Sequence, residues 1–404
     1  MIATIKAGRA GGSVVIPPSK SVAHRLLINA AMCRGESTLC NLPTNEDIAA
    51  TVDCLRAMGA QITLDGKGNC TVRGFGGGAE TAPRQLCCRE SGSTLRFLIP
   101  VAMLDGIETE FSGSERLFQR PLSIYSDICE KQGLLWQPTD KGVRVCGKLT
   151  AGDYYLPGDV SSQFITGLLL ALAESEGDSR ILLTTHPESN SYIDITVNTL
   201  AAFGIEVQRP RLREMYIRGG QRRRCVSGLS VEGDESGAAF FGALSALGDE
   251  VEMQGLDPKT LQGDRVWRTM LSEVVKGHAQ LSVADCPDLA PILMATAAAC
   301  HGVTLTHTAR LKIKESDRGA AMAEELAKCG VRTIVEDNSI TVLGGGLHAP
   351  TTPIDGHNDH RIVMAMAILL TRVGGEIQGA QAVSKSMPEF FDLLSSLGID
   401  VQIK

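Results

Sequence analysis

An internal repeat constrains the fold of this chain more than any other feature. Six times along the sequence, a short stretch rich in Gly, Ser, Asp and Pro runs directly into an apolar segment with helical spacing. One marker can be taken from each copy: Ser19, Ser91, Ser161, Ser236, Asp288 and Asp359. The steps between these markers are 72, 70, 75, 52 and 71 residues. So regular a period indicates repeated units that bury their apolar faces against one another.

A second element lies between the copies. It is seen in TVDCLRAMGAQITLDGKGNCTVRG, VNTLAAFGIEVQRPRLREMYIRGG and MAEELAKCGVRTIVEDNSITVLGG. In each segment, apolar residues at helical spacing end at a glycine, and two alternating strands follow around a turn. One repeat is therefore predicted to contain a helix, a hairpin, a strand and a second helix.

Two irregularities determine how the six repeats divide. The last copy, FFDLLSSLGIDVQIK, ends after one strand, whereas the N-terminus supplies an extra strand in ATIKAGRAGGSVVI, so we expect the N-terminal strand to complete the last repeat. Three repeats then form a discontinuous domain, residues 1–17 and 232–404, and three form a continuous domain, residues 18–231. The 52-residue step is too short for a full hairpin, which predicts that one or two strands are missing there.

Composition excludes several classes of protein. The chain of 404 residues carries 39 Lys and Arg against 46 Asp and Glu, so non-specific binding to nucleic acid is not expected. No apolar run approaches the roughly 20 residues that span a bilayer, and the first residues do not resemble a secretory signal. The 12 cysteines are scattered without a CxxC pair, which favours reduced core thiols in a cytoplasmic protein. The basic run at residues 222–224 is predicted to be a solvated loop.

The six helix starts are the candidate functional positions. Unsatisfied N–H groups and a partial positive charge allow an anion to bind at a helix start, although Ser and Asp there can also be simple N-caps. Lys20, Ser21 and Arg25 are polar or cationic residues on a helix whose other residues demand burial on every side, so they are hard to explain as surface residues. A second charge cluster lies in LKIKESDR and comprises Lys312, Lys314, Glu315, Asp317 and Arg318. For that cluster a solvated face with internal ion pairs remains an equal alternative.

The segment DGHNDHR precedes the last apolar helix and contains Asp355, His357, Asp359, His360 and Arg361. Its alternating His and Asp could bind a metal ion, but in an extended segment the ligands would point to opposite sides, so no metal is expected. Together with Arg120 and Lys385, cations gather near helix starts in both halves of a net-negative chain. This pattern fits a small ligand with several negative charges. GFGGGA, from Gly74, is only a weak match to a dinucleotide loop, because it falls in a predicted hairpin.

Eight segments carry a resemblance to a known family. SKSVAHR, SGSTLRFL, SSQF, SYIDIT, PDLAP, KESDR, NDHR and VSKSMPEFF occur in the order, and nearly at the spacing, of the motifs of the 5-enolpyruvylshikimate-3-phosphate (EPSP) synthase family. The resemblance covers essentially the whole chain. It implies an α/β protein with the two-domain enolpyruvyl transferase fold, an inside-out α/β barrel of six βαβαββ-type repeats, three per domain. It also implies transfer of the enolpyruvyl group of phosphoenolpyruvate to the 5-hydroxyl of shikimate 3-phosphate, with release of phosphate, in aromatic amino acid biosynthesis.

The resemblance assigns site residues position by position. The shikimate 3-phosphate site would comprise Lys20, Ser21, Arg25, Ser161, Ser162, Gln163, Ser189, Tyr192, Asp288 and Lys314. The phosphoenolpyruvate site would comprise Lys20, Gly92, Arg120, Gln163, Arg318, Arg361 and Lys385. Asp288 is expected to be the base and Glu315 the proton donor, with Lys20 assisting, through a tetrahedral intermediate. The site would lie in the cleft between the domains of a cytoplasmic monomer, without cofactor, metal, nucleic acid or membrane, and glyphosate is expected to compete with phosphoenolpyruvate.

The sequence departs from the family pattern at a few positions near these motifs: Pro18, Ala23, His24, Glu90 and Arg310. Arg310 stands where the family has an asparagine, so it is left out of the predicted site. Two rivals remain. The sister enzyme that transfers enolpyruvyl to UDP-N-acetylglucosamine uses a loop cysteine, which FSGSERLFQRP lacks. A non-catalytic binding or scaffold domain would have lost the acid, the base or the cations, all of which are present.

Overall fold

The computed structural model describes residues 1–75 and 82–404, so most of GFGGGA lies outside the described residues. The chain divides into two compact units. The terminal unit comprises Met1–Pro17 and Gly233–Lys404, and the central unit comprises Pro18–Glu232. The second boundary lies one residue later than the sequence predicts. Each unit is described by itself below.

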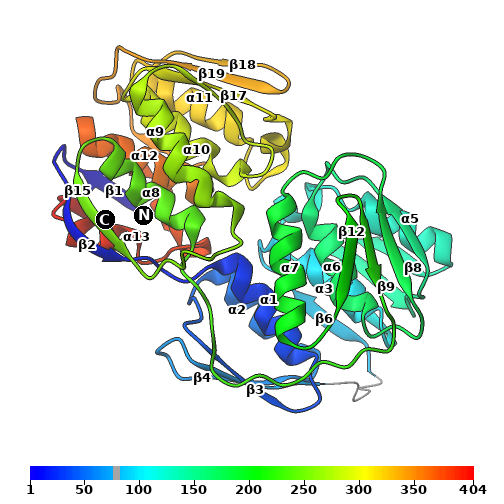
Figure 1. Cartoon of the computed structure of the whole chain (residues 1–404). Helices are drawn as coiled ribbons and strands as arrows, with labels where there is room; N and C mark the ends of the chain where they lie inside the picture. Colours follow the sequence, from blue (N-terminus) through cyan, green and yellow to red (C-terminus); the bar gives the residue numbers. More distant parts are fainter. Residues whose placement is uncertain (76–81) are drawn as a thin grey trace. The chain divides into compact units, whose positions relative to one another are not determined.

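Three four-stranded sheets of one topology form the outside of the central unit (Figure 1). In sheet order, the first has β14 (Leu229–Ser230), β3 (Glu36–Cys40), β5 (Cys70–Arg73) and β4 (Gln61–Leu64). The second has β6 (Arg84–Cys87), β7 (Gly106–Ser112), β9 (Gly142–Gly147) and β8 (Leu135–Thr139). The third has β10 (Asp153–Leu156), β11 (Ser179–Leu183), β13 (Glu214–Ile217) and β12 (Val207–Arg211). Each sheet begins with a parallel pair and ends with an antiparallel hairpin.

The terminal unit repeats this plan with one exception. One sheet has β16 (Ala279–Ser282), β17 (Gly302–Thr306), β19 (Ser339–Leu343) and β18 (Thr333–Val335). Another has β20 (Ile354–Asp355), β21 (Gly375–Gln378), β1 (Ile2–Ile5) and β22 (Val401–Ile403), so the N-terminal strand pairs with both neighbours in the last repeat. The third contains only the parallel pair β2 (Gly11–Val15) and β15 (Glu250–Gln254) among the described residues. It corresponds to the short 52-residue step.

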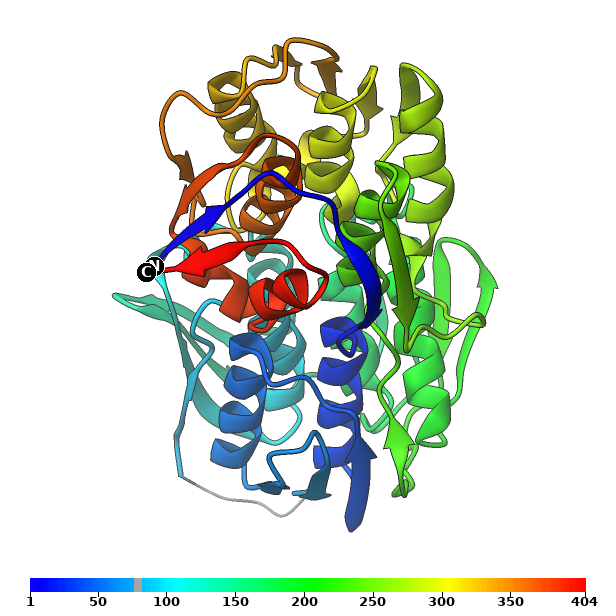
Figure 2. The ribbon, with the colours of Figure 1, turned by 90° about the vertical axis from the view of Figure 1, so that its left-hand side faces the viewer.

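Helices fill the inside of each unit (Figures 1 and 2). Those of the central unit are α1 (Lys20–Ala31), α2 (Glu46–Ala57), α3 (Gly92–Ala102), α4 (Glu115–Gln119), α5 (Ser123–Gln132), α6 (Ser162–Leu172) and α7 (Asn190–Ala202). Those of the terminal unit are α8 (Glu235–Ala246), α9 (Trp267–Lys276), α10 (Ala290–Ala298), α11 (Arg318–Lys328), α12 (His360–Val373) and α13 (Phe390–Ser396). Short 3-10 helices η1 (Gly263–Val266), η2 (Pro287–Leu289), η3 (Ala309–Ile313) and η4 (Ala380–Lys385) connect them.

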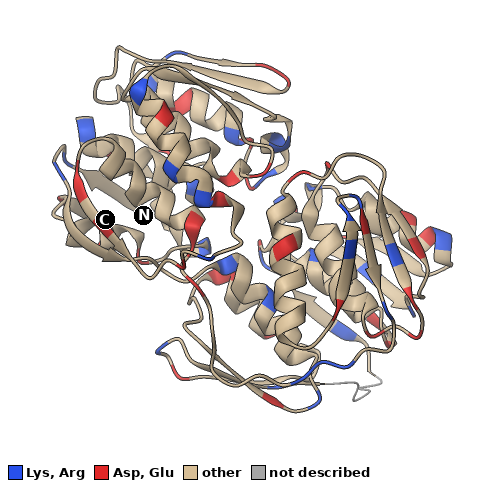
Figure 3. Cartoon of the chain, in the orientation of Figure 1, with Lys and Arg blue, Asp and Glu red and all other residues tan. Residues whose placement is uncertain are grey.

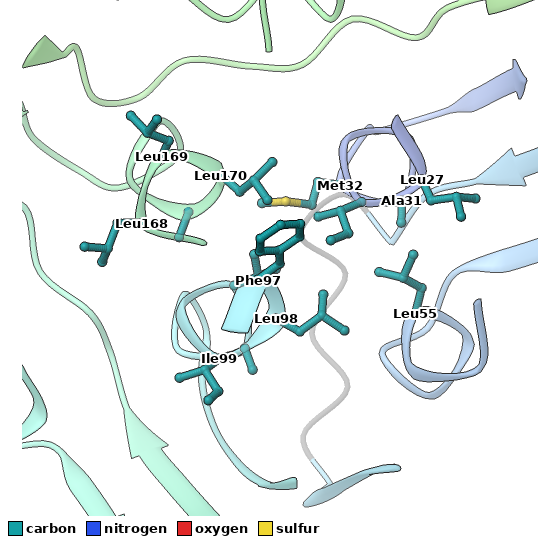
Figure 4. Packing of buried hydrophobic residues seen from close by; sticks show 14 of the residues in the cluster. Leu27, Ala31, Met32, Leu55, Phe97, Leu98, Ile99, Leu168, Leu169 and Leu170 are labelled. Atoms are coloured by element: carbon teal, nitrogen blue, oxygen red, sulfur yellow. The ribbon is translucent and has the colours of Figure 1, made fainter. Parts of the chain in front are cut away.

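The core of the central unit explains why α1, α3 and α6 are apolar on nearly every side. Leu27 and Ala31 of α1, Leu55 of α2, Phe97 of α3 and Leu169 of α6 belong to one buried cluster, part of which Figure 4 shows. α1 and α3 contact both helices and strands, and α6 packs against α3 and α7, so almost every residue of these three helices is buried. Figure 3 shows that Lys and Arg are interspersed with Asp and Glu along both units.

Glycines end the helices that precede the hairpins, as the sequence predicts. Gly59, Gly204 and Gly330 follow α2, α7 and α11 with φ of 102°, 77° and 78°. A side chain is disfavoured in this left-handed conformation, so glycine lets the chain turn sharply from helix into hairpin.

The prediction for the cysteines and the basic loop needs correction. All 12 cysteines are free thiols and seven are buried, but Cys87 and Cys225 are exposed. Arg223 in the predicted solvated loop is only 7% exposed. Its guanidinium pairs with Glu174 and donates to the Asn29 side chain at 2.8 Å. A run of like charges does not reveal that alternate side chains of an extended loop point to opposite sides. No described helix combines the length and apolarity needed to cross a membrane.

Candidate active site

The predicted residues of the central unit lie at or near helix starts. The hydroxyl of Ser91 caps α3 by accepting from the Thr94 N–H at 3.2 Å, and that of Ser161 caps α6 by accepting from the Gln163 N–H at 3.3 Å. Ser19 differs, because its buried hydroxyl makes no hydrogen bond within the described part of the chain. The first N–H groups of α1, beside Lys20 and Ser21, are therefore not capped by the Ser19 side chain, and an anion could bind to them.

Arg25 is a buried cation that has only neutral partners. The residue is 2% exposed, and its guanidinium donates to Thr196 Oγ1 at 2.8 Å, the Ser21 carbonyl at 2.7 Å and the Tyr192 carbonyl at 3.1 Å. Among the described residues no carboxylate pairs with it. Burial lowers the pKa of this guanidinium to about 9. An anionic ligand would supply the missing counter-charge.

Gly92, Arg120 and Gln163 meet around an arginine that the sequence analysis missed. Arg96, 3% exposed on α3, donates to the side-chain oxygen of Gln163 at 2.7 Å, and Gln163 donates to Ser93 at 3.0 Å. A Cβ built on Gly92 would stand 2.7 Å from Arg120 Nη1 and 3.1 Å from Arg96 Nη1. The absence of a side chain at Gly92 is thus what allows both guanidinium groups to approach the start of α3.

Lys20 is neutralised within the central unit. Its ammonium group forms an ion pair of 2.8 Å with Asp47 at the start of α2, another partner that the sequence analysis missed. Both side chains are about one-sixth exposed, at 16% and 15%. Ser189 precedes α7 in a left-handed conformation with φ of 57°, which a non-glycine residue seldom adopts. Its hydroxyl therefore sits on a backbone turn held in a costly conformation.

Arg318 is the centre of the site in the terminal unit. Its guanidinium, 1% exposed, contacts three carboxylates: Asp288 at 2.7 Å, Glu315 at 2.7 Å and Asp359 at 2.9 Å. Asp359 is fully buried and also caps α12, accepting from the Arg361 N–H at 2.9 Å. The alternative that the charge cluster at residues 312–318 forms a solvated face is therefore wrong for Arg318. The partner role of Asp359 was not predicted, because sequence alone does not show which carboxylate faces which cation.

Asp288 is surrounded by three cations. Besides Arg318, it contacts Lys314 at 3.1 Å and Arg361 at 3.1 Å, and its own side chain is 19% exposed. Burial raises the pKa of this carboxyl, but Arg361, Lys314 and Arg318 outweigh burial and hold the pKa well below its usual range. Burial also lowers the pKa of Lys314. Asp288 lies in η2 between two prolines, so the marker taken from the sequence stands one residue before Leu289, the N-cap of α10.

A strained loop carries the remaining residues. Asn358 has φ of 49° and His357 has φ of 48°, and the Asn358 carbonyl accepts from Lys385 at 2.6 Å. Glu325 on α11, fully buried, accepts from the Asp355 N–H at 2.9 Å and contacts the His357 ring at 2.8 Å. This pair of contacts holds the loop that leads into α12.

One group of possible metal ligands exists among the described residues. Glu324, Glu325 and His357 offer ligand atoms within 4.8 Å of one another. Lys328 already contacts both Glu325 oxygens, Oε2 at 2.8 Å and Oε1 at 2.9 Å, and the Asp355 N–H donates to Oε2, so the group is explained as part of the loop contacts. The predicted His and Asp alternation does not form a cluster of three ligands in the described chain.

Comparisons with known proteins show the family and the fold of the chain. A sequence model of the family EPSP synthase (3-phosphoshikimate 1-carboxyvinyltransferase) matches residues 5–394. The 3-phosphoshikimate 1-carboxyvinyltransferase of Clostridium kluyveri is 39% identical over 412 residues, covering 96% of each chain. That of Clostridium novyi is 37% identical and covers 96% of this chain and 95% of its own. A solved structure of the EPSP synthase from Acinetobacter baumannii, 24% identical, superposes with a TM-score of 0.79 over 100% of both chains. This likeness confirms the predicted fold, and the chain belongs to the EPSP synthase family.

Proposed function

We propose that this protein transfers the enolpyruvyl group of phosphoenolpyruvate to the 5-hydroxyl of shikimate 3-phosphate, with Asp288 as general base and Glu315 as proton donor. Membership of the family supports the reaction. The residue roles rest on one observation: Arg318 joins Asp288, Glu315 and Asp359 in a single network of ion pairs. Such a network positions two carboxylates with different partners side by side, as an acid and base pair requires.

Shikimate 3-phosphate would bind mainly to the central unit. Arg25 is suited to its carboxylate, because a buried guanidinium with neutral partners gains most from an anion. The uncapped start of α1 and the hydroxyls near the starts of α6 and α7 are suited to its phosphate. The proposed ligands are Lys20, Ser21, Arg25, Ser161, Ser162, Gln163, Ser189, Tyr192, Asp288 and Lys314.

Phosphoenolpyruvate would be held by cations of both units. Its carboxylate and phosphate need several guanidinium and ammonium groups, since two anionic substrates otherwise repel each other. The bare backbone of Gly92 leaves space beside Arg120 for close approach. The proposed ligands are Lys20, Gly92, Arg120, Gln163, Arg318, Arg361 and Lys385.

The charges around Asp288 suggest how the base becomes effective. In the free protein its carboxylate is ionised, because three cations lower its pKa. When anionic substrate groups share Arg318, Arg361 and Lys314, those cations stabilise the carboxylate less, and its pKa rises toward the usual value. The ionised oxygen can then accept the proton of the 5-hydroxyl. Glu315 would protonate the methylene carbon of phosphoenolpyruvate, and the tetrahedral intermediate would lose phosphate by the reverse proton transfers.

Phosphate release from the two substrates tests these roles. Asp288→Asn and Glu315→Gln preserve shape and remove the titrating oxygen, so each should lower kcat by about a hundredfold or more. Asp337→Asn is a matched control, because Asp337 is fully exposed and bonds only Lys312 among the described residues. Calorimetric binding of shikimate 3-phosphate should survive in Glu315→Gln. Full activity in either active-site variant would overturn the corresponding role.

We further propose that the enzyme works as a monomer in the cytoplasm, without metal or cofactor. Twelve free thiols favour a reducing compartment. Sedimentation velocity at working concentration should give one species of about the chain mass, 43.0 kDa. A stable dimer, or activity abolished by a chelator, would contradict this part of the proposal.

A further inference from the structure

A basic hollow lies in the central unit, at the end of α7. Its volume is about 400 Å³, and Arg218, Arg222 and Arg224 are among the residues that line it. Glu206 is the one acidic residue in the described lining. Three arginines and a single acidic residue therefore line this hollow, in a protein whose net charge is -7.

These three arginines are exposed and have no side-chain partner in the described part of the chain. Asp178, the acid on which Arg218 acts electrostatically, accepts a hydrogen bond from the Tyr216 hydroxyl instead. Neighbouring like charges repel one another, so the cluster is electrostatically unfavourable until an anion binds.

The loop that presents the arginines is held rigidly. The Gln221 side chain accepts from the Glu206 N–H at 2.8 Å and donates to the Glu206 and Arg218 carbonyls at 3.0 and 2.8 Å. The backbone N–H groups of Gly220 and Gln221 donate to the Ser175 and Ala173 carbonyls at 2.7 and 2.9 Å. A pre-formed loop loses little conformational entropy when a ligand binds.

Within this loop Arg223 has a structural role, whereas Arg222 and Arg224 are exposed and available to bind a ligand. It points inward, pairs with Glu174 and donates to the Leu170 carbonyl at 2.6 Å near the C-terminal end of α6. Because Arg223 already donates to a carbonyl at this helix end, Arg222 and Arg224 are not needed to pair with that end of the helix. The loop also bonds Phe203 directly after α7. The substrate residues proposed on these two helices, Ser162 and Gln163 on α6 and Tyr192 on α7, lie near the opposite helix ends, about 16–20 Å away along helices of this length.

We propose that this hollow binds a small anion that carries two or more linked phosphate groups. One guanidinium group can bind two phosphate oxygens at once. Three such groups match a diphosphate or triphosphate better than they match an anion with a single charge. The volume lies within the range of small-ligand sites. Inorganic polyphosphate and nucleoside polyphosphates share this chemistry. The proposal is independent of the transferase assignment, and its failure leaves that assignment unchanged.

Calorimetric titration with pyrophosphate and with tripolyphosphate tests the site. The test variant is Arg218→Gln, Arg222→Gln and Arg224→Gln together. The control is Arg211→Gln, Arg213→Gln and Arg332→Gln, which removes the same charge from exposed arginines outside the lining. The titrations are run with saturating shikimate 3-phosphate, and all three proteins carry Arg361→Gln. Both conditions reduce binding of the probe at the proposed substrate site. Wild type and control should bind one probe per chain, and the test variant should bind about a hundredfold more weakly, or about fivefold for each single change.

With Arg361 restored, turnover and melting temperature should be the same in the test variant and in wild type when no probe is present. Equal affinity in wild type and test variant would overturn the proposal, as would an equal loss in the control, which would indicate general charge attraction. An arm with ATP distinguishes the source: tighter binding than tripolyphosphate supports a nucleotide, and equal binding supports recognition of the phosphate chain alone.

Discussion

We expect Arg25 to strengthen the binding of shikimate 3-phosphate without stabilising the folded protein. Its buried charge lacks a carboxylate, and burial lowers its pKa to about 9. Two of its acceptors, the hydroxyls of Thr166 and Thr196, also hydrogen-bond each other at 2.9 Å, so each keeps a hydrogen-bond partner when the arginine is removed. Arg25→Met should leave the melting temperature unchanged or raise it, while the KM for shikimate 3-phosphate rises about a hundredfold or more. A large loss of stability with unchanged KM would show that Arg25 is structural.

Asp264 should make stability depend on pH. The residue is 2% exposed, and burial together with the charge of Asp288 raises its pKa to about 7, against the opposing effect of Arg361. The folded protein therefore holds a proton that the unfolded chain releases above about pH 4, so this group's contribution to stability falls as pH rises from about 4 to 7. Asp264→Asn should flatten that part of the melting-temperature profile. An unchanged slope in the variant would contradict the assignment.

Gly92 should control discrimination between phosphoenolpyruvate and glyphosate. The Cβ of Gly92→Ala would stand 2.7 Å from Arg120 Nη1, so this guanidinium must shift. If glyphosate, the longer molecule, uses the same cations, inhibition should weaken more than the KM for phosphoenolpyruvate rises. Steady-state kinetics with both ligands measure the two changes, and equal losses would count against this arrangement.

At the scale of elements, α11 positions the loop before α12. Glu325 contacts the Asp355 N–H and the His357 ring, and the Asn358 carbonyl of that loop accepts from Lys385. Glu325→Gln should therefore raise the KM for phosphoenolpyruvate more than it lowers kcat. Glu324→Gln on the exposed side of the same helix is the control. A pure loss of folded protein, with normal kinetics in what remains, would show that Glu325 has no positioning role.

The loop after β13 provides a stability prediction. Arg223→Gln breaks a buried ion pair with Glu174 and should lower the free energy of unfolding by about 3–5 kcal/mol. The exposed neighbour change Arg222→Gln should alter it by about 0.5 kcal/mol or less. Urea unfolding measures both values. Equal effects would mean that Arg223 is solvated, as its sequence context alone predicts.

Repeats and helix ends were predictable because they follow local rules. Periodicity indicated the helices, glycine indicated their ends, and the missing partner of the last strand indicated a role for the N-terminus. The side-chain partners were not predictable. Asp47, Arg96 and Asp359 meet Lys20, Gln163 and Arg318 only through packing of elements distant in sequence, and Arg223 is buried by the fold rather than by its neighbours in the chain.

For the molecule as a whole, each unit presents its own set of charged and polar groups. The central unit contributes a buried cation and uncapped helix N–H groups, and the terminal unit contributes two carboxylates on a shared arginine. Arg25, the proposed binder of the shikimate 3-phosphate carboxylate, belongs to the central unit, whereas the proposed base and acid, Asp288 and Glu315, belong to the terminal unit. The proposed reaction therefore requires residues of both units.

Phosphate release with alternative acceptors tests the central claim most directly. Purified protein, phosphoenolpyruvate and either shikimate 3-phosphate or UDP-N-acetylglucosamine are the only components needed. We predict phosphate release that requires both phosphoenolpyruvate and shikimate 3-phosphate, with none above background for the nucleotide sugar. Release with UDP-N-acetylglucosamine, or no release with shikimate 3-phosphate from folded protein, would contradict the account.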